Sequence, residues 1–156
     1  MVTLAQLWAN HPAQQEPQII NPCSTNGVPN HKNQCVIRLG VALANSGVSL
    51  DSYTGAFCWN GHGRAHPLRV EEMRLWLDSE EAWFIPNYAE KYFRDARGIQ
   101  KTAHDFYGRN GIVAFVNFWG TGNQGDHIDL WNGARIALGD PSYFERSQEL
   151  WFWELS

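Results

Sequence analysis

Hydrophobic residues recur with a helical period in three segments of the chain. TLAQLWAN (3–10) and PLRVEEMRLWLDS (67–79) each gather leucines and a tryptophan loosely on one face, and each predicts a short helix. CVIRLGVALANSG (35–47) is apolar on successive turns and ends in an Asn-Ser-Gly stop. This third pattern predicts a buried helix of about three turns.

The helical period is absent from the segments between these helices. Residues 12–34 contain four prolines separated by Asn and Gly, so we expect irregular structure there and no helix. Residues 51–68 are rich in turn-forming residues and predict a loop with at most one short strand. Residues 87–107 have a mixed pattern, which we interpret as helical in pieces.

From residue 111 onward the pattern becomes extended. GIVAFVNFW (111–119) is rich in β-branched and aromatic residues and predicts a central strand. GDHIDLW (125–131) alternates, the Asn132-Gly133 pair is a strong hairpin signal, and ARIAL (134–138) is expected to return antiparallel. With helices first and a sheet last, the sequence predicts a single α+β domain over residues 1–156.

Composition and charge narrow the classes of partner. The chain has 156 residues, 44% of them hydrophobic, which is enough for one sizeable core. A formal charge of −4 with 18% charged residues offers no basic face for a phosphate backbone, so we expect no nucleic-acid partner. The first 15 residues lack the features of a signal peptide, and no apolar run is long enough for membrane insertion.

His127 is the first candidate for chemistry. Alternation along GDHIDLW places His127 and Asp129 on one strand face, where a structural strand would more cheaply carry Val or Thr. Reflection of the chain about the hairpin turn brings Asp140 roughly opposite His127. Asp129 lies two residues along the same strand, at a strand rise of roughly 6 to 7 Å. We favour Asp140 as the carboxylate that orients the imidazole, with Asp129 as the alternative.

Cys35 is the candidate nucleophile. It falls in the first turn of the predicted helix, after Asn33 or Gln34 as N-cap, with Asn33 the better capping residue. At that position the helix dipole stabilises a thiolate, and backbone N–H groups can bind an oxyanion. The alternative is a small buried hydrophobic residue, which is the usual role of a free cysteine.

The motifs resemble a known family. N-Q-C-x-I-R around Cys35 and D-H-I-D-L-W-N-G around His127, together with the opening TLAQLWANHP, are similar to blocks of the type VI secretion amidase effector 4 family, NlpC-type papain-like cysteine amidases. The resemblance implies a nucleophile at a helix N-terminus, packed on a C-terminal antiparallel sheet. It places the nucleophile on Cys35 and the base on His127. The third member falls nearest Asp140, but at a slightly longer spacing than in the family, so Asp129 stays open.

The resemblance also implies a reaction. Cys35 would attack the γ-D-glutamyl–meso-diaminopimelate bond of a peptidoglycan stem peptide, and His127 would protonate the leaving amine and then activate water. No cofactor or metal is implied. Two alternatives remain: a non-catalytic module that binds glycan or peptide, and a Cys-His deamidase or acyltransferase that acts on a protein.

Partners and location follow from the same resemblance. We expect a monomer, made in the cytoplasm without a signal peptide, loaded through a component of the secretion apparatus, and active in the periplasm of the target bacterium. A cognate immunity protein would block the cleft between the Cys35 helix and the His127 strand. The loop from 53 to 67 does not match the family blocks, and would set which inhibitor fits.

Weaker predictions concern the substrate groove and the other cysteines. The candidate substrate-binding residues are Asn33, Gln34, Arg38, Trp59 and Trp131. In an oxidising periplasm Cys23 could pair with Cys58 and leave Cys35 free, with two unpaired structural cysteines as the alternative. His62 and His66 with Cys58 make an unconvincing zinc pattern, so we expect both histidines to be exposed loop residues.

Overall fold

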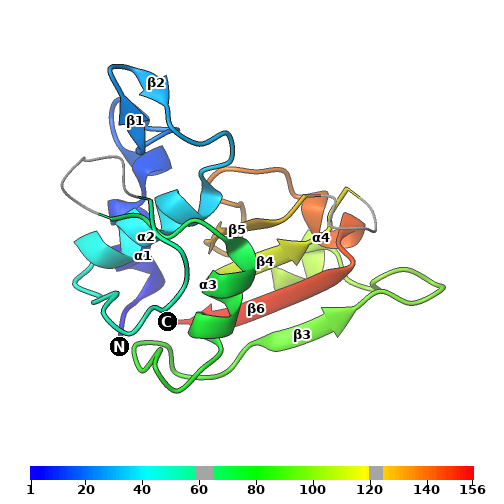
Figure 1. The fold of residues 1–156 in the computed structure, drawn as a ribbon. Coiled ribbons are helices and arrows are strands. Elements are labelled where there is room, and N and C mark those ends of the chain that lie inside the picture. Colours follow the sequence, from blue (N-terminus) through cyan, green and yellow to red (C-terminus); the bar gives the residue numbers. More distant parts are fainter. Residues whose placement is uncertain (59–64, 120–124) are drawn as a thin grey trace.

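The computed structural model describes residues 1–58, 65–119 and 125–156 (Figure 1). The helical elements are α1 (Leu4–Asn10), η1 (Pro12–Gln14, a 3-10 turn), α2 (Cys35–Asn45), α3 (Val70–Leu77), η2 (Ala103–Phe106, a 3-10 turn) and α4 (Tyr143–Arg146). The strands are β1 (Ser24–Thr25), β2 (Val28–Pro29), β3 (Glu90–Phe93), β4 (Asn110–Val116), β5 (His127–Trp131) and β6 (Glu149–Leu155).

The main sheet has four antiparallel strands in the order β3-β6-β4-β5. One face packs against α1, α2 and α3, with Ile112, Ile128 and Trp153 in that core. The other face carries a second, largely aromatic core that includes Phe106, Phe144 and Phe152. A sheet covered on both faces explains why β4 is apolar at almost every position.

The N-terminal helix is fixed at its first turn. Thr3 and Gln6 form a capping box at the start of α1, and the Leu4 N–H donates to the carbonyl of Ser156, 2.9 Å away. The two chain ends therefore lie close together (Figure 1). Helix α2 packs between α1 and strand β5, so the residues at its first turn face the edge of the sheet.

The α+β class and the three main helices are as predicted, but three segments differ from expectation. Residues 87–107 form β3 and the turn η2, not a series of α-helical pieces. Residues 134–138 make one isolated bridge, Trp131 to Ile136, and no full strand. Residues 12–34 do contain the 3-10 turn η1 and the small β1-β2 hairpin. The central strand β6 was not predicted.

The sequence predicted no membrane-inserted segment, and the observed helices agree with this. In the parts of the chain that the structure describes, every helix is too short or too polar to span a bilayer.

Candidate active site

Cys35 is the first residue of α2 and is almost completely buried. Gln34 is the N-cap by backbone geometry, and its side chain makes no capping hydrogen bond. The predicted capping residue, Asn33, accepts a hydrogen bond from the Cys35 N–H through Oδ1 at 3.2 Å. The N–H that we expected to be free for an oxyanion is therefore engaged, and a substrate oxygen has to displace Asn33 from it.

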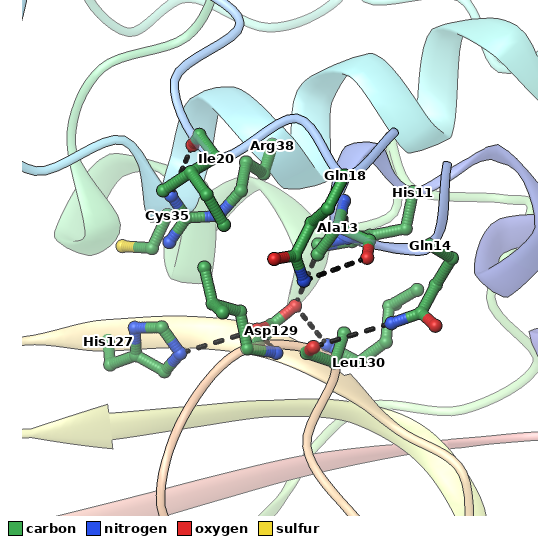
Figure 2. Close-up of polar contacts among 12 residues, drawn as sticks. His11, Ala13, Gln14, Gln18, Ile20, Cys35, Arg38, His127, Asp129 and Leu130 are labelled. Atoms are coloured by element: carbon green, nitrogen blue, oxygen red, sulfur yellow. Dashed lines mark hydrogen bonds and ion pairs between the residues drawn. The ribbon is translucent and has the colours of Figure 1, made fainter. Parts of the chain in front are cut away.

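His127 opens strand β5 opposite Phe115 of β4, and its ring stacks on the Phe115 ring. Cys35 is close enough to His127 to influence the pKa of the imidazole, and Figure 2 draws both side chains to one side of Asp129. Because Nε2 faces Asp129, Nδ1 is the ring nitrogen left for the thiol. Burial lowers the pKa of His127, but Asp129 and Cys35 outweigh it and raise the pKa to about 9.

Asp129 lies at the centre of a buried polar row. Its Oδ2 is 3.4 Å from Nε2 of His127, and its Oδ1 is 2.8 Å from Nε2 of His11 (Figure 2). The backbone N–H groups of Leu130 and Leu138 each donate to this carboxylate at 2.8 Å. Burial favours the neutral acid, yet contacts with the two histidines hold the pKa of Asp129 below its usual range. The carboxylate is therefore ionised at neutral pH.

His11 is a site residue that the sequence analysis missed. It lies between α1 and η1 and is completely buried. Its Nδ1 accepts a hydrogen bond from the N–H of Ala13 at 3.1 Å. That contact places the proton of the neutral ring on Nε2, which faces Asp129. In the sequence the only signal was a histidine beside Pro12, at the end of an amphipathic helix.

Asp140, the favoured third member, does not reach His127. It is exposed, and its Oδ1 accepts the N–H of Ser142 at 2.8 Å, just before α4. These contacts with Ser142 lower the pKa of Asp140. The reflection about the turn did find the right neighbourhood, since a Cβ added to Gly139 would lie 3.3 Å from Nε2 of His127. The adjacent side chain points elsewhere, and Asp129 occupies the place assigned to Asp140.

A cavity of about 510 Å³ opens beside His127. It lies between the segment preceding α2, the first turns of α2, and the residues before β5 and α4. Its lining includes Lys32, Asn33, Arg38, Trp119, His127 and Tyr143. The imidazole of His127 is therefore accessible from the cavity, and the cationic side chains of Lys32 and Arg38 form part of the cavity wall.

The predicted substrate-binding residues divide between the cavity and the core. Asn33 and Arg38 line the cavity, and Arg38 also donates from Nη1 to the Ile20 carbonyl at 2.8 Å. Gln34 also lines the cavity, but its side-chain amide bonds to the backbone of Cys23. The amide oxygen accepts from the Cys23 N–H and the amide nitrogen donates to the Cys23 carbonyl, both at 2.9 Å. The Gln34 amide therefore holds the segment around Cys23 in place before α2.

The two tryptophans predicted as groove walls have different outcomes. Trp131 is fully buried, and its Nε1 donates to the Phe106 carbonyl at 2.8 Å, so the prediction was wrong because the ring fills the aromatic core. Trp59 lies outside the described residues. Trp119, which is 69% exposed, lines the cavity.

The predictions for the remaining cysteines and histidines also need correction. No disulfide joins Cys23 to Cys58 in the described chain. His66, expected on the surface, is 7% exposed, with its Nδ1 3.3 Å from Sγ of Cys58. His62 lies outside the described residues. The Cys58 and His66 side chains are therefore packed together in the interior.

Known structures share this architecture. The effector of the Tae4–Tai4 effector–immunity complex from Enterobacter cloacae aligns over 100% of both chains with a TM-score of 0.66 and 21% identity. Tae4 of Enterobacter cloacae gives 0.66 at 20% identity over 100% of this chain and 98% of that one. Tae4 in the complex from Salmonella typhimurium gives 0.64 at 20% identity, over 100% and 99%. The predicted papain-like α+β fold is thereby confirmed.

Sequence comparison gives the family. No curated protein matches the chain. The profile for "Type VI secretion system (T6SS), amidase effector protein 4" matches residues 31–153, a span that includes Cys35, His127 and Asp129. This span is most of the chain and contains both motifs that carried the resemblance. The chain therefore belongs to the amidase effector protein 4 family of the type VI secretion system.

Proposed function

We propose that this amidase effector is a cysteine amidase that hydrolyses the γ-D-glutamyl–meso-diaminopimelate bond of peptidoglycan stem peptides. The observation that carries the proposal is the buried row Cys35, His127 and Asp129, in which His127 lines a cavity of about 510 Å³. Membership of an amidase effector family supports the reaction class. The specific bond rests on the family resemblance of the motifs.

The proposed reaction uses each member of the row in turn. The Cys35 thiol gives its proton to His127, and Sγ attacks the amide carbonyl to form a tetrahedral intermediate. His127 then protonates the departing amine, which leaves a thioester on Cys35. The same imidazole takes a proton from water, and the resulting hydroxide cleaves the thioester and frees the thiol. Asp129 holds the ring in position and stabilises its charged form throughout.

The wall of the cavity suits an anionic peptide. Lys32 and Arg38 both line it, together with Asp126, and Arg38 is largely buried. A stem peptide carries free carboxylates beside the proposed scissile bond, and a guanidinium binds such groups well. We propose Arg38 and Asn33 as the substrate-positioning residues. We also propose that the chain forms a single amidase domain.

Digestion of purified peptidoglycan tests the reaction and the bond together. Sacculi incubated with the protein and analysed by mass spectrometry should yield muropeptides split between D-glutamate and diaminopimelate, with new amino groups on diaminopimelate. The Cys35→Ala variant should yield none. Intact muropeptides with the wild-type protein, cleavage at another bond, or deamidation without cleavage would each contradict the proposal.

We also propose a cognate immunity protein as a partner, because the structural relatives from both bacteria are described as effector–immunity pairs. It would cover the cavity between α2 and β5 and keep substrate from Cys35. Co-expression in the periplasm with the product of the neighbouring gene should restore growth, and the purified partner should stop muropeptide release in vitro. Protection without inhibition in vitro would refute occlusion of the cavity.

A further inference from the structure

A second group of sulfur and nitrogen donors lies away from the Cys35 site. Cys23, Cys58 and His66 are all buried, and one potential ligand atom from each lies within 4.8 Å of the other two. The closest measured approach is 3.3 Å between Sγ of Cys58 and Nδ1 of His66. The proposed hydrolysis uses none of these three side chains.

The backbone holds two of the three donors opposite each other. The Cys58 N–H donates to the His66 carbonyl at 2.8 Å, and Phe57 pairs with Pro67 in an antiparallel bridge. These contacts form a narrow ladder at the base of the loop. Cys58 and His66 therefore face the same point because their backbones are paired.

The third donor arrives from a different segment and is fixed by a glutamine. The Gln34 side chain accepts from the N–H of Cys23 and donates to its carbonyl, both at 2.9 Å. Cys23 thus lies at a defined place beside Ile37 of α2, within a small apolar cluster that includes Cys58. The arrangement of the three donors depends on no bound ion.

Hydrogen-bond donors surround the two sulfurs. The backbone N–H of His66 donates to Sγ of Cys58 at 3.2 Å, and Asn30 Nδ2 donates to Sγ of Cys23 at 3.6 Å. Donors of this kind stabilise negative charge on sulfur, and they surround thiolates that bind metals.

We propose that Cys23 Sγ, Cys58 Sγ and His66 Nδ1 bind one Zn²⁺ ion, with water in the fourth position. Two thiolates and an imidazole are donors that zinc prefers, and tetrahedral bonds of about 2.3 Å to sulfur and 2.0–2.1 Å to nitrogen put neighbouring donors roughly 3.5–3.8 Å apart. The 3.3 Å between Sγ of Cys58 and Nδ1 of His66 would widen slightly, and the other separations, which lie within 4.8 Å, would contract by at most about 1 Å. Binding releases the two thiol protons to solvent.

The proposed role of the ion is structural. It would tie Cys23, in the irregular segment before α2, to the base of the loop before α3. That segment continues to Asn33 and Gln34, next to the nucleophile. Zinc would therefore stiffen one wall of the substrate cavity without taking part in hydrolysis, in a region that has little regular secondary structure of its own.

Zinc content of the reduced full-length protein tests the proposal. After dialysis against zinc with a phosphine reductant, wild-type protein should retain about one ion per chain. Cys35→Ala is the matched control, because it removes the one thiol outside the cluster and should retain zinc equally. Cys58→Ser and Cys23→Ser should each bind zinc at least about tenfold more weakly. Zinc should raise the unfolding midpoint of wild type and Cys35→Ala only.

Cobalt substitution can be measured on the wild-type protein alone, so this test does not require the cysteine variants to fold. Co²⁺ should give a tetrahedral spectrum with thiolate-to-metal charge transfer, and Cys35→Ala should give the same spectrum. Absence of metal from the reduced wild-type protein would overturn the proposal. So would a cobalt spectrum without thiolate bands, loss of zinc in Cys35→Ala, or retention of zinc by folded Cys58→Ser and Cys23→Ser.

Discussion

The molecule contains two buried cysteine–histidine pairs with different third partners. Cys35 raises the pKa of the His127 imidazole, and Nε2 of that ring contacts the buried carboxylate of Asp129. Cys58 contacts His66, and the third group there is the thiol of Cys23. The same two side-chain types are thus placed in two electrostatic settings within one chain of 156 residues.

The third partner decides what each pair can do. A carboxylate raises the proton affinity of the imidazole, so the His127 ring can accept the proton of the nucleophile and later deliver it to the leaving amine. A second thiol supplies no such charge in its neutral form, but it adds a donor atom on the same side as the first two. The first arrangement favours acid–base chemistry, and the second favours a bound cation.

The largest effect on activity should come from removal of the Cys35 sulfur, and removal of the Cys58 sulfur gives the contrast. Cys35→Ala should lower muropeptide release by roughly 10⁴-fold or more, since no other group can form the acyl enzyme. Cys58→Ser should instead change stability, with kcat per folded molecule within about threefold of wild type. The measurement is release from sacculi, normalised to the folded fraction by circular dichroism. Equal losses in the two variants would remove the distinction between the pairs.

The two candidate carboxylates come next. Asp129→Asn should lower kcat by roughly 10²- to 10⁴-fold, because the amide cannot stabilise the imidazolium that forms at His127. Asp140→Asn should remain within about twofold of wild type, since its contacts are with Ser142 at the surface. If Asp140→Asn shows the larger loss, the assignment of the third member to Asp129 is wrong.

His11 is expected to act through Asp129, as a positioning residue. His11→Phe keeps the ring shape but removes the contact with Oδ1, so kcat should fall about tenfold with little change in KM. His11→Gln, which can donate to the carboxylate again, should recover part of the loss. The exposed His104 provides a control, His104→Phe, with no effect on kcat. A change in folded fraction alone would indicate that His11 is only structural.

The smallest effect concerns the space beside the imidazole. A Cβ at Gly139 would lie 3.0 Å from Tyr143 Cε2 and 3.3 Å from His127 Nε2, which is tighter than ordinary packing. Gly139→Ala should therefore displace the ring slightly and lower kcat roughly three- to tenfold, with the unfolding midpoint little changed. Unaltered kinetics would mean that Tyr143 moves and the ring does not.

The sequence predicted most elements around the site and missed the strand that joins them. Strand β5 and helix α2 each show one clear period, and β4 is rich in β-branched and aromatic residues, so their type could be predicted. Strand β6 pairs with both β3 and β4 and is buried on both faces. Its residues, ELWFWEL, therefore alternate poorly, and β3 is an edge strand of four mostly polar residues. Neither gives the pattern of a half-buried strand.

Local sequence patterns also predicted only some of the side chains in the candidate active site. Cys35 and His127 were found from their motifs and their places on a helix and a strand. Asp129 was ranked second because strand rise separates it from His127, yet two side chains on one face can lean together to 3.4 Å. His11 lies between α1 and η1. Its approach to Asp129 depends on tertiary packing, which local periodicity does not encode.

The most direct test of the carboxylate–imidazole assignment is the titration of His127 itself. Histidine-labelled protein, followed by NMR and assigned with His127→Gln, should show His127 losing its proton at a pKa of about 9. Because the folded pKa is raised, the imidazolium and its stabilising contacts persist below that value and are lost as pH rises through it. Asp129→Asn should return the pKa toward its ordinary value of 6.5, and Asp140→Asn should leave it unchanged. A wild-type pKa near 6.5, or a fall caused by Asp140→Asn, would contradict the account.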